Sequence, residues 1–203
     1  MMEHSDPRLR LMAITDDLRD GTAGLVSRAI AAERGGATMV MLRLKHVDAR
    51  VLVEVGSALV ASLAIPVIVH ERLDVALACR AAGVHLGASS MPVAAIRPHV
   101  AADFLIGGSV SSAVDVGGVL ASDYVTVGPV FGAGEASVGL DGLRRLAASC
   151  GRPVLAIGGV DTAAALSVLA AGARGIAVIR AVLGAADPAA AAGALVGALR
   201  VRA

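Results

Sequence analysis

Side chains suited to chemistry follow a series of short apolar runs, each at the C-terminal end of its run. They are Thr15, Asp16, Arg43, Lys45, His70, Glu71, His85, Ser109, Ser111 and Arg180. His70 and Glu71 place an imidazole next to a carboxylate, a pair that could transfer protons or bind a metal. Arg43 and Lys45 alternate with Leu44, so both would lie on one side of a strand and favour an anionic substrate. The alternatives are a surface loop for the first pair and solvated charges for the second.

A pair of glycines and a later apolar run predict a phosphate site. Glycine lets backbone N–H groups approach an anion closely, and a short helix after the last run would point its N-terminus at the same anion. We therefore expect phosphate to bind at Gly158, Gly159, Ile179 and Arg180. The alternative is a plain Gly-Gly turn.

The apolar runs are the elements that must position these side chains. They cover 11–15, 39–43, 66–69, 83–86, 104–107, 124–128, 153–157 and 175–179. Each is apolar nearly throughout, which is typical of strands covered on both faces of a parallel sheet. His85 lies within one run, between Val84 and Leu86, which favours a structural histidine facing the interior.

Segments rich in Ala, Leu and Arg alternate with the runs and have helical character. They cover 22–34, 48–63, 72–82, 161–171 and a last helix opening at Asp187-Pro188. Asp48, Asp161 and Asp187 are suited to cap helices, and Gly83 and Gly172 to end them. Eight such units predict a single α/β domain, a (β/α)8 TIM barrel over 1–203, with a flexible segment at 1–9. The alternative is a doubly wound sheet, although no G-x-G-x-x-G follows the first run, so dinucleotide binding is not supported.

Composition excludes several other classes of protein. The 203 residues are 56% hydrophobic, 1% aromatic and 17% charged, with a net charge of +1. Without a basic block or aromatic side chains for stacking, a nucleic-acid partner is not expected. Prolines and glycines interrupt the long uncharged runs, so no membrane span is expected. With no signal core and two isolated cysteines, Cys79 and Cys150, we expect a cytoplasmic protein without disulfides.

Several motifs, taken together, resemble the thiamine phosphate synthase family and its relatives, the thiazole tautomerases. The resemblance runs from about Leu11 to Pro188. It rests on Ala13-Ile14-Thr15-Asp16, Met41-Leu42-Arg43-Leu44-Lys45, Arg72-x-Asp74-Val75-Ala76, Gly83-Val84-His85-Leu86-Gly87, Gly107-Gly108-Ser109-Val110, Asp123-Tyr124-Val125-x-x-Gly128-Pro129-Val130-Phe131 and Ala156-Ile157-Gly158-Gly159.

The resemblance implies a barrel enzyme of thiamine biosynthesis. Synthases of this family join a hydroxymethylpyrimidine diphosphate to a thiazole phosphate, with Mg²⁺ holding the diphosphate. By this resemblance the partner is a small phosphorylated thiazole or pyrimidine. As polar residues at the strand ends, Thr15, Arg43, His85 and Ser109 are expected to bind the substrate. The high hydrophobic content of the chain could supply the interface of a homodimer. It would equally be used by helices that pack on a barrel.

The chain departs from the family pattern at the metal positions. Glu71 stands where the synthases have the Asp of Asn-Asp-Arg, and Ser90 stands where they have a second carboxylate. The stretch 132–137 lacks the family's threonines and lysine, and Ser111 stands where the tautomerases have their histidine. We therefore expect tautomerase-like proton transfer on a thiazole phosphate, with catalytic residues His70, Glu71, Lys45 and Ser111. The alternatives are a Mg²⁺-dependent synthase and a non-catalytic binder.

Overall fold

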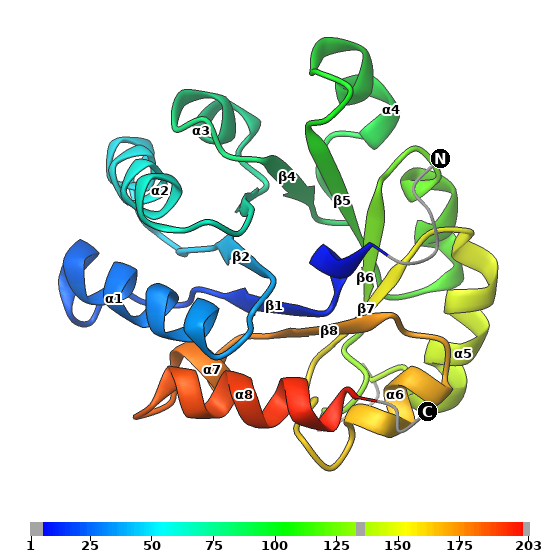
Figure 1. Ribbon diagram of the computed structural model, residues 1–203. Coiled ribbons are helices and arrows are strands. Elements are labelled where there is room, and N and C mark those ends of the chain that lie inside the picture. The colour runs from blue at the N-terminus through cyan, green and yellow to red at the C-terminus, as the bar shows by residue number, and fades with distance from the viewer. Residues whose placement is uncertain (1–5, 133–136, 201–203) are drawn as a thin grey trace.

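Eight parallel strands form a closed barrel with helices around its outside (Figure 1). The computed structural model describes residues 6–132 and 137–200. The strands are β1 (Leu11–Ile14), β2 (Met39–Leu42), β3 (Val67–His70), β4 (Gly83–Leu86), β5 (Leu105–Val110), β6 (Tyr124–Val127), β7 (Val154–Ile157) and β8 (Gly175–Val178). The barrel closes where Leu11 of β1 pairs with Ile176 of β8. The predicted (β/α)8 barrel is confirmed, and the doubly wound alternative is wrong because such a sheet remains open.

The strands match the apolar runs to within a residue, except for β5. Parallel strands covered by helices are buried on both faces, so the apolar pattern locates them well. β5 extends to Val110 instead of ending at residue 107, which places Ser109 inside the strand. Because parallel strands share one direction, their C-terminal ends, and the polar residues that follow them, lie at one end of the barrel. We call this end the mouth.

Helices connect the strands and cover the barrel. They are α1 (Gly21–Arg34), α2 (Ala49–Ser62), α3 (Leu73–Ala78), α4 (Val93–Ile96), α5 (Gly139–Cys150), α6 (Ala165–Ala170), α7 (Arg180–Leu183) and α8 (Pro188–Ala198). Short 3-10 helices cover Pro7–Leu9, Arg97–His99 and Ala113–Val119, and the last of these connects β5 to β6 in place of an α-helix.

The predicted helix caps are confirmed only in part. Asp187 accepts a hydrogen bond from the Ala190 amide at 3.0 Å and caps α8. Asp48 precedes α2, but its side chain makes no capping hydrogen bond. Asp161 accepts from the Ala164 amide at 2.9 Å, so it caps a turn that precedes α6 rather than α6 itself.

The helix expected over 72–82 is shorter, because α3 ends at Ala78. Gly83 therefore does not stop a helix: it begins β4. A Cβ at this position would lie 2.1 Å from the Leu105 carbonyl oxygen, so glycine is needed for the close approach of β4 to β5. Gly172, with φ +101°, follows the end of α6 as predicted.

Aliphatic side chains fill the barrel interior. The largest buried aliphatic side chains there are Met12, Ile14, Met39, Met41 and Ile68, and they pack with the aromatic ring of Tyr124. Two further apolar clusters lie between the strands and the surrounding helices. Branched and small aliphatic residues suit both layers, which accounts for a chain rich in hydrophobic but poor in aromatic residues.

The described chain begins at Asp6. Residues 1–5 of the segment expected to be flexible lie outside the described residues, whereas Asp6 caps the Pro7–Leu9 helix and Leu9 is buried. Among the described residues, no helix has both the length and the apolar character needed to cross a membrane.

Candidate active site

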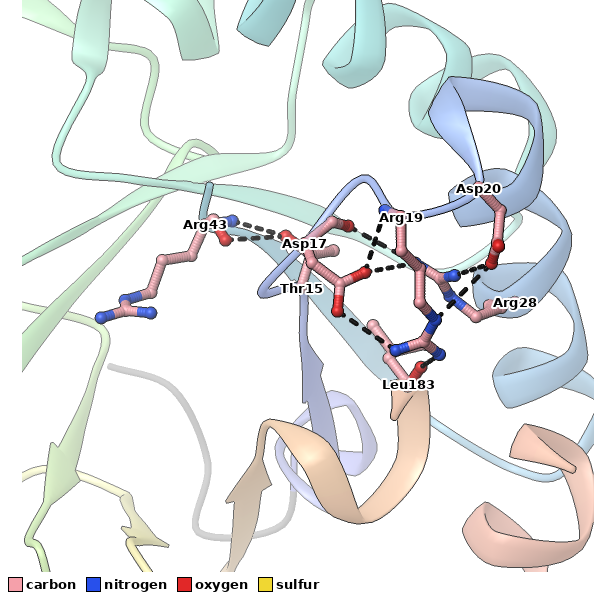
Figure 2. Close-up of polar contacts among 7 residues, drawn as sticks. All are labelled: Thr15, Asp17, Arg19, Asp20, Arg28, Arg43 and Leu183. Atoms are coloured by element: carbon pink, nitrogen blue, oxygen red, sulfur yellow. Dashed lines mark hydrogen bonds and ion pairs between the residues drawn. The ribbon is translucent and has the colours of Figure 1, made fainter. Parts of the chain in front are cut away.

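Thr15 joins the ends of β1 and β2 at the mouth of the barrel. Its side chain is fully buried, and its hydroxyl accepts from the Arg43 amide at 2.8 Å and donates to the Arg43 carbonyl at 3.1 Å. These contacts fix the backbone from which the Arg43 side chain projects. The guanidinium is partly exposed, and its Nη1 lies 3.5 Å from Asp16 Oδ1. Figure 2 shows the Arg43 side chain directed away from the neighbouring cluster of Asp17, Arg19, Asp20 and Arg28.

Glu71 and Ser90 come together next to His70, at the ends of β3 and β4. The Ser90 hydroxyl donates to Glu71 Oε1 at 3.2 Å and accepts from the Gly87 amide at 3.0 Å. His70 Nδ1 lies 3.8 Å from Glu71 Oε2. Glu71 has a φ of +61°, a conformation that non-glycine residues rarely adopt. Its amide donates to the His85 carbonyl at 2.8 Å, which holds the turn in this conformation.

His70 is held neutral near pH 7 by its surroundings. Burial lowers the pKa of His70 most, and the positive charges of Arg43 and Lys45 lower it further, against the opposing effect of Glu71. Of these three charged residues, Glu71 contacts the His70 ring directly, at 3.8 Å. Lys45 itself is exposed.

His85 lies in the barrel interior beneath His70, and the two rings stack with centroids 6.2 Å apart and planes inclined by 19°. Its Nδ1 lies 3.3 Å from the Tyr124 hydroxyl, and its Nε2 lies 3.0 Å from Ser109 Oγ and 3.2 Å from Thr126 Oγ1. Complete burial lowers the pKa of His85 to about 3, so the ring is neutral. His85 therefore orients the hydroxyl of Ser109, the more exposed member of this network.

Sequence reasoning missed Tyr124 and Thr126 as members of this network. Tyr124 is the only tyrosine in the chain, and Thr126 is a polar residue within an apolar strand. A polar group in a fully buried strand needs a hydrogen-bond partner, and this was the available signal. Burial also raises the pKa of Tyr124, so its hydroxyl stays protonated.

Ser111 is bonded within the turn that follows β5 and does not join the network around His85. Its amide and hydroxyl both donate to Asp115 Oδ2, at 2.8 Å and 2.9 Å, and the Ser112 amide and hydroxyl donate to the same oxygen. Asp115 thus completes the capping box in which Ser112 is the N-cap of the Ala113–Val119 helix, and Ser111 is exposed beside it. The structure brings Ser111 to the same end of the barrel as Ser109, but its hydroxyl is engaged in the turn.

The four residues expected to bind phosphate lie at the ends of β7 and β8. Gly158 and Gly159 have φ values of +94° and +68°. A Cβ at Gly158 would lie 2.6 Å from Pro129 Cα, and one at Gly159 would lie 2.5 Å from the Phe131 carbonyl oxygen. Both positions thus require glycine for conformation and for space. Ile179 and Arg180 form the start of α7 on the adjacent strand end.

A family model described as thiamine monophosphate synthase matches residues 11–182, most of the barrel. The chain belongs to this family.

Members of the thiamine monophosphate synthase family match the chain along most of its length. A "Thiamine-phosphate synthase" of Roseiflexus sp. (strain RS-1) is 41% identical over 196 residues, 90% of this chain and 81% of the relative. One of Albidiferax ferrireducens is 40% identical over 204 residues, 96% of this chain and 90% of the relative. Among solved structures, "Thiamine phosphate pyrophosphorylase" from Pyrococcus furiosus superposes with a TM-score of 0.83 at 35% identity, covering 95% of this chain and 96% of that one.

More distant structures share the fold alone. A 3-hexulose-6-phosphate synthase superposes with a TM-score of 0.71 at 21% identity, covering 94% of this chain and all of its own. This likeness shows that the barrel is common to enzymes of different chemistry, so function must be argued from the site.

The donor set of this family member fits a Mg²⁺ site that depends on substrate. Among the described residues, no group of three or more His, Cys, Asp or Glu side chains could form a metal cage. Glu71 and Ser90 nevertheless supply a carboxylate and a hydroxyl within 3.2 Å of each other. Mg²⁺ is commonly held by one or two carboxylates together with substrate phosphates, and these residues meet that minimum. Residues 133–136, within the stretch lacking the family's threonines and lysine, lie outside the described residues.

Proposed function

We propose that this protein couples a hydroxymethylpyrimidine diphosphate to a thiazole phosphate, producing thiamine phosphate and pyrophosphate. Identity of about 40% to thiamine-phosphate synthases over nine-tenths of the chain carries the proposal. It favours the synthase alternative over the tautomerase-like chemistry expected from the sequence. The mouth of the barrel supports the same choice, because cations end β2 and the glycine turn after β7 lies next to the start of α7, an arrangement suited to binding an anion.

In this reaction the C–O bond between the pyrimidine methylene and the diphosphate breaks, and pyrophosphate leaves with the electron pair. The thiazole nitrogen then forms a C–N bond to the resulting pyrimidine-methyl cation. Arg43 and Lys45 would stabilise the negative charge that grows on the leaving group. The backbone of Gly158 and Gly159, with the start of α7, would bind the thiazole phosphate and orient the nitrogen for attack.

Glu71 and Ser90 would hold Mg²⁺ against the diphosphate. The ion, when bound, neutralises charge on the phosphate oxygens. Ser90 contributes no charge, so the site depends on the diphosphate for its remaining oxygen ligands, and we expect metal affinity in the absence of substrate to be low.

A neutral His70 suits a reaction that passes through a cation. A second positive charge beside the pyrimidine-methyl group would raise the energy of that cation. Burial of His70, together with Arg43 and Lys45, keeps its pKa low, and His85 beneath it is also neutral. We propose that the His70 ring covers the substrate and excludes water, which would otherwise capture the cation.

The proposal is tested by incubating the purified protein with both substrates and Mg²⁺ and quantifying thiamine phosphate and pyrophosphate. We expect the two products in equal amounts, and we expect Arg43→Ala and Lys45→Ala each to lower kcat/KM by about 100-fold or more. Arg144→Ala is the matched control, since Arg144 pairs with Asp141 on the exposed side of α5.

Two outcomes would contradict the coupling reaction. Turnover of the thiazole carboxylate phosphate tautomer without coupling would restore the tautomerase-like interpretation, in which His70 or Glu71 moves the proton. Binding of thiazole phosphate with turnover in neither assay would instead identify a non-catalytic binder.

A further inference from the structure

The loop between β1 and α1 carries a cluster of charged side chains that the proposed reaction does not use. Asp17, Arg19 and Asp20 come from this loop, and Arg28 comes from α1. Arg28 donates to Asp17 Oδ1 at 3.1 Å and also to the Asp20 carboxylate, and only 11% of its side chain is exposed. Figure 2 shows these side chains turned toward one another. The loop is thereby fixed to α1.

Arg19 connects this cluster to α7, which follows β8. Its Nη1 donates to Asp17 Oδ2 at 3.1 Å, and its Nη2 donates to the Leu183 carbonyl at 3.1 Å, across 164 residues of sequence (Figure 2). Leu183 is the last residue of α7. Carbonyl groups in the last turn of a helix lack partners within the helix, and Arg19 supplies one to Leu183.

Val182 and Leu183 anchor α7 in the apolar layer around the barrel, and the Arg19 contact adds a polar tie between α7 and the loop. A cavity of about 160 Å³ lies between the loop and α7, and its lining includes Arg19, Arg28, Ile179, Arg180 and Leu183. Side chains therefore do not completely fill the space between the β1–α1 loop and α7. Because α7 is a single turn of four residues, a displacement of Leu183 is transmitted directly to Ile179 and Arg180 at its start.

We infer that Arg19 is a positioning residue that holds the start of α7 where the phosphate of the substrate binds. This inference rests on the proposed function, since that function assigns the thiazole phosphate to Ile179 and Arg180. The same loop carries Asp16, which pairs with Arg43. The loop would thus link the turn assigned to one substrate's phosphate with the cation assigned to the other's diphosphate. The role of Arg19 in this arrangement is positional, because its guanidinium is engaged by Asp17 and the Leu183 carbonyl.

The test compares binding of a phosphorylated and an unphosphorylated ligand to the full chain. Dissociation constants for thiazole phosphate and for the same thiazole without phosphate are measured by titration calorimetry on the parent, Arg19→Ala and Arg19→Lys. We expect Arg19→Ala to weaken binding of thiazole phosphate about fivefold, the effect of one lost hydrogen bond, and to leave the unphosphorylated thiazole unaffected. Arg19→Lys retains a charged donor and should recover part of the loss. Arg144→Ala, which removes an exposed arginine of α5, should match the parent.

Inorganic phosphate separates failure of this inference from failure of the proposed function. It is titrated while the backbone amide resonances of Ile179 and Gly159 are followed by NMR. If the parent binds inorganic phosphate there but not thiazole phosphate, the proposed function fails, and a weaker phosphate response in Arg19→Ala still supports the inference. Equal phosphate affinity in Arg19→Ala and the parent would overturn it. An equal loss for the phosphorylated and unphosphorylated thiazoles would also overturn it, because that pattern indicates general damage to the fold.

Discussion

At the scale of single residues, the site combines groups whose partners are close in sequence with groups whose partners are distant. Glu71 lies beside His70 in the chain, and the family resemblance marked Ser90 as the position of a second metal carboxylate. The hydroxyl of Thr15 and the guanidinium of Arg19 instead bond to backbone atoms of other elements, at Arg43 and Leu183. A backbone carbonyl has no residue-type signature, so sequence could not indicate these contacts.

Replacing Ser90 with a carboxylate tests whether Mg²⁺ binds beside Glu71. Ser90→Asp places a carboxylate beside Glu71 Oε1, where the serine hydroxyl is now 3.2 Å away, and an aspartate oxygen can still accept from the Gly87 amide. A second carboxylate adds charge to the proposed Mg²⁺ site. We expect the Mg²⁺ concentration for half-maximal coupling activity to fall about tenfold. It is measured by titrating Mg²⁺ at saturating concentrations of both substrates.

Ser89→Asp is the control for this prediction, because it adds the same charge one position earlier. If both variants shift the Mg²⁺ dependence equally, the effect is a general change in charge. If neither shifts it, Glu71 and Ser90 are not the metal position.

At the scale of elements, strand positions were predictable and helix details were less so. A strand buried on both faces needs a continuous apolar run, and this signal located the strands closely, except that β5 continues to Val110. Helix ends depend on weaker local preferences: Asp48 does not cap α2, and Gly83 belongs to a strand. The 3-10 helix at Ala113–Val119 was not predicted, although Ser112 and Asp115 form a recognisable capping box there.

Gly107 shows how one element makes room for the side chains of its neighbours. A Cβ at this position in β5 would lie 2.3 Å from Tyr124 Cζ and 2.4 Å from His85 Nδ1. Gly107→Ala should therefore displace the buried network and lower the free energy of unfolding by about 1–3 kcal/mol, measured by urea denaturation. Gly118→Ala is the matched control, since a Cβ there meets nothing within 4 Å. An unchanged stability for Gly107→Ala would show that Tyr124 and His85 are not held tightly by β5.

At the scale of the whole molecule, the barrel is predictable because every level of the sequence agrees with it. Apolar runs of strand length alternate with helical segments, and aliphatic residues suit both the interior and the helix–strand layer. This architecture also places the polar strand ends at one mouth. It does not specify a reaction, since the same barrel occurs in a 3-hexulose-6-phosphate synthase. The choice of synthase chemistry therefore depends on identity to relatives and on the residues at the mouth.

Acid stability of the whole molecule should depend on His85. Its folded-state pKa of about 3 lies below the usual value of 6.5 because the ring is buried, so the unfolded chain binds a proton that the folded chain does not. Stability from this neutral histidine is fully present above about pH 6.5 and is lost progressively as pH falls toward 3. Between pH 7 and pH 5 the loss is about 2 kcal/mol, which follows from about 1.36 kcal/mol per pH unit below 6.5.

His85→Gln removes this titration while keeping a polar side chain near Ser109 and Thr126. We expect the variant to be less stable than the parent at pH 7, but to lose about 2 kcal/mol less on transfer to pH 5, as measured by urea unfolding at both pH values. His99→Gln, which alters an exposed histidine, should retain the pH dependence of the parent. If His85→Gln instead loses as much stability as the parent between pH 7 and pH 5, the acid sensitivity of the barrel must originate at other groups. His70 would be the first of these to test, because burial lowers its pKa in the same direction.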